Sequence, residues 1–73
     1  MEWSTADVEW VLGQLGFNLA RRESHDTYVK QGHMRTVSVP RNRSAITKGT
    51  LGSIWRQAGI SGQQARELRE KKR

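Results

Sequence analysis

The spacing of the apolar residues changes at Gly16, and this change limits the folds open to the chain. Before it, apolar residues recur at i, i+3, i+4 and i+7, as they do along one face of a helix: Val8, Val11, Leu12 and Leu15. After it, the helical period is lost over residues 17–40, and short segments of strand character follow one another between turn residues. The pattern therefore predicts a helix followed by strands.

Local signals give the limits of three helices. Ser4 or Thr5 can cap the first, with Asp7 in its first turn, so we expect it to run from Thr5 to Leu15. The second opens at Gly49-Thr50 and ends at Gly59. Its apolar residues repeat the helical spacing, and we expect Trp55 among them to lie in the core rather than to stack on a base: Leu51, Ile54, Trp55 and Ala58. Residues 61–64 match a capping box and start a short third helix.

Three strands are expected over 17–21, 27–30 and 35–39. In the third, Arg35, Val37 and Val39 alternate with polar residues, so one side of the strand should face a core. Residues 31–33 form a plausible hairpin turn with His33 solvated at its tip, and Pro40 ends the third strand because it has no amide hydrogen to donate.

The resulting order is helix, three strands, helix, short helix. It predicts an α+β fold in which a three-stranded antiparallel sheet carries the helices on one face, as in a double-stranded-RNA-binding domain. The other sheet face would be free for functional groups. The 73 residues have room for one domain, 1–73, and residues 69–73 are expected to be a frayed basic tail.

Charge points to a polyanionic partner. Thirteen Lys and Arg against seven Asp and Glu give a net charge of +6, and most of the basic residues lie in the middle of the chain, which we expect to face nucleic acid. Cysteine is absent, so thiolate metal sites and thiol nucleophiles are excluded. No apolar run approaches the roughly 20 residues that span a bilayer, and the first residues lack a signal-peptide pattern, so a cytoplasmic protein is expected.

Several short motifs occur in a familiar order. They are Gly16-Phe17, Arg22-Glu23-Ser24-His25-Asp26-Thr27-Tyr28, Val37-Ser38-Val39-Pro40, and Lys48-Gly49-Thr50-Leu51 followed by Ile54, Ala58, Gly59 and Ile60. Together they resemble the HicA toxin family of toxin–antitoxin pairs, over nearly the whole chain. Each motif alone is weak, but their order and spacing are specific.

The resemblance implies a metal-independent endoribonuclease that cleaves mRNA, needs no cofactor, and is neutralised by a HicB-type antitoxin. The catalytic histidine of the family's Gly-Ser-His motif corresponds to His25. The chain departs from the family pattern twice. Glu23 stands where the family usually has glycine, and Asn42 stands where many members have a second histidine, so the mechanism depends on His25 alone.

RNA carries its own nucleophile, the 2′-hydroxyl, so one histidine that moves its proton and a cation beside the phosphate can suffice. Basic and hydroxyl side chains in the middle of the chain are the expected RNA ligands: Arg22, Ser24, Tyr28, Lys30, Arg41, Arg43 and Lys48. No metal site is expected, because His25, His33 and Asp26 lack a recognised ligand spacing.

Two other functions are open. Residues 54–68 also read as a helix-turn-helix, which would suit a DNA-binding regulator, although Glu67 and Glu70 lie on the would-be recognition helix. Alternatively, the chain binds RNA by shape and phosphate contacts without cutting it, a reading that Glu23 and Asn42 support.

Overall fold

The computed structural model describes residues 2–72, and it has the predicted element order. The elements are α1 (Thr5–Gln14), β1 (Asn18–Arg22), β2 (His25–Val29), β3 (Val37–Pro40), α2 (Lys48–Ala58) and α3 (Gly62–Glu70). The three strands form one antiparallel sheet in the order β1-β2-β3. The α+β class is thus confirmed, whereas the likeness to a double-stranded-RNA-binding domain stays a prediction.

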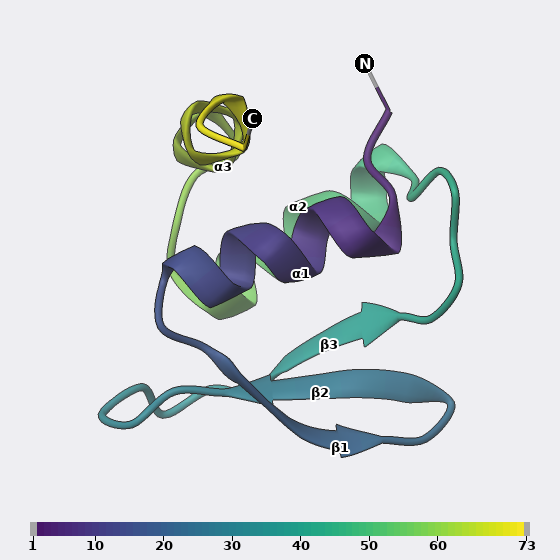
Figure 1. Ribbon diagram of the computed structural model, residues 1–73. Coiled ribbons are helices and arrows are strands. Elements are labelled where there is room, and N and C mark those ends of the chain that lie inside the picture. Colours follow the sequence, from purple (N-terminus) through teal and green to yellow (C-terminus); the bar gives the residue numbers. More distant parts are fainter. Residues whose placement is uncertain (1, 73) are drawn as a thin grey trace.

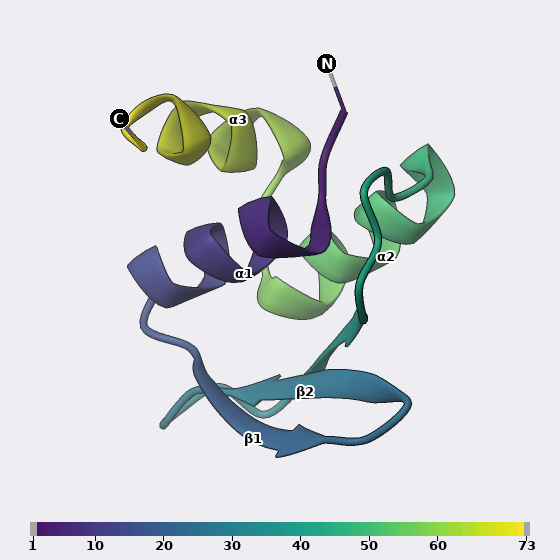
Figure 2. The same ribbon diagram turned by 45° about the vertical axis from the view of Figure 1, so that its right-hand side comes forward.

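The elements are stacked in layers. Helices α1 and α2 lie over one face of the sheet, and α3 lies on the far side of these two helices (Figures 1 and 2). The core fills the space between the helices and the sheet, and six of its side chains are almost fully buried: Leu12, Ile54, Val8, Val11, Val37 and Val39. The predicted apolar stripe of α1 and the inward side of β3 are both part of it. Trp55 is 6% exposed, which confirms that it belongs to the core.

The predicted starts of α1 and α3 are confirmed by their caps, whereas α2 begins at Lys48, one residue before the predicted start, with Thr47 as its N-cap. The Asp7 amide donates a hydrogen bond to the Ser4 hydroxyl, and the Ser4 amide donates one to the Asp7 carboxylate, each at 3.1 Å. Ser61 and Gln64 form the same reciprocal pair at the start of α3. At the end of α2, Gly59 has a φ of 80°, a left-handed conformation that glycine adopts without steric cost.

The strand limits differ from prediction. β2 begins at His25 rather than Thr27, because His25 pairs with Pro40 of β3 at the end of the ladder. β3 begins at Val37, so Arg35 lies in the exposed loop before it. The strand propensity of residues 25 and 26 is weak, so it does not predict that they belong to β2. Their pairing with β3 determines where β2 begins.

The C-terminal end also differs from prediction. Helix α3 continues to Glu70, past the point where a frayed tail was expected to begin. The Arg69 guanidinium lies 3.9 Å from the centre of the Trp3 ring, and the Lys72 ammonium is 3.4 Å from an Asp7 carboxylate oxygen. These contacts join α3 to the start of the chain. Residue 73 lies outside the described residues.

Candidate functional site

His25 is exposed on the sheet face that is turned away from α1 and α2, which we call the open face. Side chains alternate along β2: Asp26 and Tyr28 are buried toward the helices, whereas His25 and Val29 are exposed. The cross-strand partner of His25, Pro40, ends β3. The imidazole is therefore accessible to a large ligand that approaches the open face.

A tight turn between β1 and β2 presents His25. The Glu23 amide donates to the His25 carbonyl at 3.2 Å, and Arg41 Nη1 donates to the Glu23 carbonyl at 3.0 Å. The Ser24 hydroxyl lies 3.5 Å from His25 Nδ1. Among the described residues other than glycine, only Asn42 has a positive φ, so the backbone at Glu23 does not require the glycine usual in the family.

Asp26 lies behind this turn, on the side that faces the helices. It is 3% exposed, and its Oδ1 is 3.3 Å from Arg22 Nε and 3.4 Å from Arg41 Nε. Because a buried carboxylate needs cationic partners, Arg22 and Arg41 are held toward Asp26. Two of the predicted RNA ligands thus support the turn instead of pointing along the open face.

A second carboxyl group lies beside Asp26. Burial and the neighbouring Asp26 raise the pKa of Glu9 in α1 to about 7, and burial together with Glu9 raises the pKa of Tyr28 to about 12. Glu9 Oε2 is buried without a hydrogen-bond partner among the described residues. The two carboxyl groups repel each other unless Glu9 is protonated, so a proton is held here near neutral pH.

The other predicted RNA ligands do not gather around His25. Tyr28 is 8% exposed and faces the helices, so the prediction that its hydroxyl contacts RNA does not fit its position. Lys30 follows β2, about 16 Å along the strand from His25 at ~3.3 Å per residue. Arg43 is exposed in the loop after β3, and Lys48 is the first residue of α2. Among the predicted RNA ligands, Ser24 lies next to the imidazole and, unlike Arg22 and Arg41, makes no contact with Asp26.

Arg21 was not among the predicted site residues, yet it lies on the open face. It pairs with Thr27, two positions from His25 in β2, whereas its neighbour Arg22 pairs with Asp26. A register irregularity between Leu19 and Arg21 causes this placement, and the sequence carries no recognisable signal for it.

His33 has a different environment from the one predicted. Instead of being solvated, it is half-buried, and its Nε2 lies 2.8 Å from the Gln57 carbonyl of α2. Its ring also meets the Phe17 ring edge-on, with 5.2 Å between centroids. His33 therefore ties the β2–β3 loop to α2, at the end of the sheet opposite His25.

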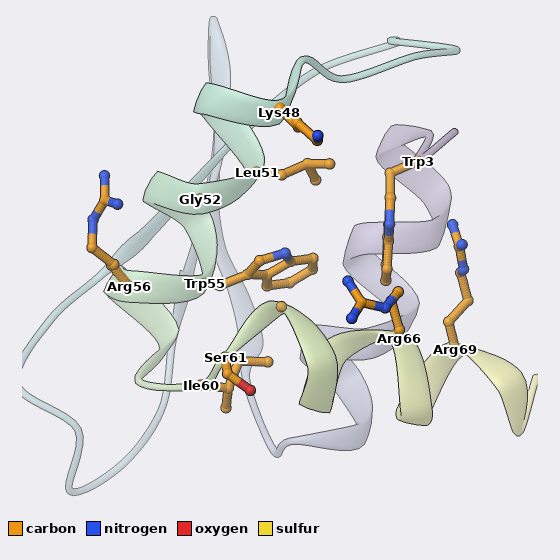
Figure 3. A pocket seen from close by; sticks show the side chains of 11 residues that line it. Trp3, Lys48, Leu51, Gly52, Trp55, Arg56, Ile60, Ser61, Arg66 and Arg69 are labelled. Carbon is orange, nitrogen blue, oxygen red and sulfur yellow. The ribbon is translucent and has the colours of Figure 1, made fainter. Parts of the chain in front are cut away.

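A pocket of about 510 Å³ opens between α2 and α3, on the helix side of the molecule (Figure 3). Its floor includes Leu51 and Trp55, and the side chains of Lys48 and Arg66 extend into it from the two helices. This places Lys48 on a different side of the protein from His25. The pocket contributes nothing to the turn that presents the imidazole.

Comparison with known proteins gives one family. The family model described as the HicA toxin of bacterial toxin–antitoxin systems matches residues 5–60, from the start of α1 to just beyond α2. No curated protein matches the sequence. Within residues 2–72, none of the helices has both the length and the apolar character that crossing a bilayer demands.

Proposed function

Because the chain belongs to the HicA toxin family, a toxin of a toxin–antitoxin system, we propose that it is a metal-independent endoribonuclease that cleaves mRNA with His25. The observation that carries the proposal is the exposure of His25 on the open face, at a turn fixed by Arg41 and by the buried Asp26. The histidine that corresponds to the catalytic residue of the family motif is thus accessible to an RNA that approaches the open face.

In the proposed reaction the RNA supplies the nucleophile. The His25 imidazole takes the proton of the 2′-hydroxyl while the bond from the 2′-oxygen to phosphorus forms and the bond from phosphorus to the 5′-oxygen breaks. The imidazolium then returns this proton to the departing 5′-oxygen. The products are a 2′,3′-cyclic phosphate and a 5′-hydroxyl end, and the histidine is regenerated.

The remaining polar residues have two proposed roles. Arg22 and Arg41 hold the turn through Asp26 and the Glu23 carbonyl, while the Ser24 hydroxyl orients the imidazole through Nδ1. The exposed cations Lys30, Arg43 and Lys48 contact more distant phosphates. The net charge of +6 supports such salt-dependent binding.

The family also implies an antitoxin partner. We propose that it is a HicB-type protein and that it covers the open face at His25. An exposed catalytic group on an uncovered sheet face offers a partner direct access, and a protein bound there would exclude RNA.

The test uses the purified chain and a synthetic RNA in the presence of EDTA. We expect wild type to yield fragments with 2′,3′-cyclic phosphate ends, identified by mass spectrometry, and His25→Ala to yield none. The matched control is His33→Gln, which removes the other histidine, at the opposite end of the sheet, and should retain cleavage. Cleavage by His25→Ala would refute the single-histidine mechanism.

The same variants can be expressed in bacteria. Wild type should arrest growth and deplete bulk mRNA, His25→Ala should do neither, and co-expression of the antitoxin should restore growth. Asn42 favours one second candidate, an RNA-binding protein without catalysis, because it removes an acid or base that many family members have. RNA binding by a wild type that leaves the RNA intact would support that candidate.

A further inference from the structure

We propose that Arg21 is the cation that contacts the scissile phosphate beside His25, and that a β-bulge at Ala20 places it there. This inference rests on the proposed ribonuclease function. From sequence position alone, the neighbouring Arg22 would be expected to contact the phosphate.

The pairing of β1 with β2 fixes the faces of the two arginines. Arg22 is opposite Asp26, and their 3.3 Å ion pair places the Arg22 side chain on the helix side. Arg21, the preceding residue, is opposite Thr27. Because successive side chains of a strand point to opposite faces, Arg21 belongs to the open face with His25.

The bulge keeps this arrangement in a strand that contains Ala20. Leu19 pairs with Tyr28 and Arg21 pairs with Thr27, so Ala20 is an extra residue without a partner of its own in β2. Regular pairing onward from Leu19 would set Ala20 opposite Thr27 and Arg21 opposite Asp26. Arg21 would then face the helices, and Arg22 would lie opposite His25 on the open face, so the bulge decides which of the two arginines shares that face with His25.

Arg21 is also close enough to act with His25. Thr27, its cross-strand partner, is two residues from His25 on the same face of β2. Side chains in this diagonal relation start about 7–8 Å apart, and an extended arginine spans most of that distance. One phosphate group can therefore contact the guanidinium and, through its ribose, the imidazole.

The other cations near His25 are already engaged. Arg22 and Arg41 are ion-paired with Asp26, and Lys30 is at the other end of β2. Arg21 is exposed and has neither a hydrogen-bond nor an ion-pair partner within residues 2–72. It is thus free to take the charge that develops on the non-bridging phosphate oxygens when the 2′-oxygen attacks.

The role predicts a loss in the chemical step more than in binding. Removing one group that stabilises such charge typically lowers kcat about 10²–10³-fold. We expect a loss of this size for Arg21→Gln under single-turnover conditions, with KM changed only a few-fold. Arg21→Lys, which keeps the charge but not the forked donors, should recover part of the rate.

The matched control is Arg35→Gln, which removes the same charge from the exposed β2–β3 loop. It should keep kcat within about threefold of wild type. Far-UV circular dichroism and a thermal melt of each variant check the fold. Because Arg21 is exposed, its replacement should leave the spectrum and the Tm unchanged.

The outcomes separate this inference from the proposed function. If wild type cleaves, His25→Ala does not, and Arg21→Gln has the kcat of Arg35→Gln, the role of Arg21 is wrong while the ribonuclease function stands. An Arg21→Gln variant that loses only affinity, with kcat intact, also overturns it. If wild type itself does not cleave RNA, both proposals fail.

Discussion

Replacing Glu9 by glutamine should stabilise the protein at neutral and alkaline pH. The Glu9 carboxyl lies beside the buried Asp26, and its pKa is raised from 4.5 to about 7. A raised pKa means that the folded state binds the proton more tightly than the unfolded chain. Stability therefore falls as the pH rises from about 4.5 through about 7, and above that range the full cost of the charged pair is present.

The size of the effect follows from the pKa difference. At 1.36 kcal/mol per pKa unit, the shift corresponds to at most about 3 kcal/mol, and the partial exposure of Glu9 reduces this to about 1–2 kcal/mol. Glutamine has nearly the same shape, keeps an oxygen for the Tyr28 hydroxyl and offers an amide hydrogen to Asp26. In a chain of this length, about 1 kcal/mol shifts Tm by ~4–8 °C.

The assay is urea unfolding of wild type and Glu9→Gln between pH 5 and pH 8.5. We expect similar stability at pH 5 and a widening advantage of Glu9→Gln above pH 6. Glu67→Gln, which makes the same charge change on the exposed side of α3, is the control and should leave the pH dependence of wild type unchanged. A Glu9→Gln variant that is equally destabilised at every pH would refute the reasoning.

Three further changes test the fold and the proposed RNA surface. Leu12→Ala should cost about 2–5 kcal/mol in urea unfolding, because Leu12 is fully buried between α1 and the sheet, and a loss below 1 kcal/mol would contradict the described core. Gly59→Ala should destabilise by about 1–2 kcal/mol, since φ is 80° and a Cβ would lie 3.4 Å from the His33 ring; an unchanged Tm would argue against this cap. Lys48→Glu should weaken RNA binding across sequences and flatten its dependence on salt, measured by fluorescence anisotropy at several salt concentrations. Equal salt slopes for Lys48→Glu and wild type would show that Lys48 does not contact phosphate.

The helices and the fold class could be predicted because their signals are local. Ser4, Asp7, Ser61 and Gln64 form their caps within four residues of sequence, and the apolar stripe of α1 lies on a single element. The strand limits could not be predicted in this way, because β2 begins where Pro40, distant in sequence, provides a pairing partner for His25.

The site was only partly predictable for the same reason. The family motif predicts a role for His25, which stays a prediction, but the partners of Arg22 and Arg41 depend on Asp26 being buried under α1. Burial of an aspartate flanked by polar residues has no sequence signature. Tyr28 looked like a hydroxyl donor for RNA because the side of β2 that faces the helices was not known.

The unpaired Ala20 also makes the first strand tolerant of a change in length at this one position. Loss of its single codon would remove the bulge but leave Leu19 opposite Tyr28, Arg21 opposite Thr27 and Arg22 opposite Asp26, so both arginines would keep their faces. A residue lost or gained between the arginines and His25 would instead change their register against β2. In related chains, one-residue length differences should therefore fall before the arginines rather than between them and His25.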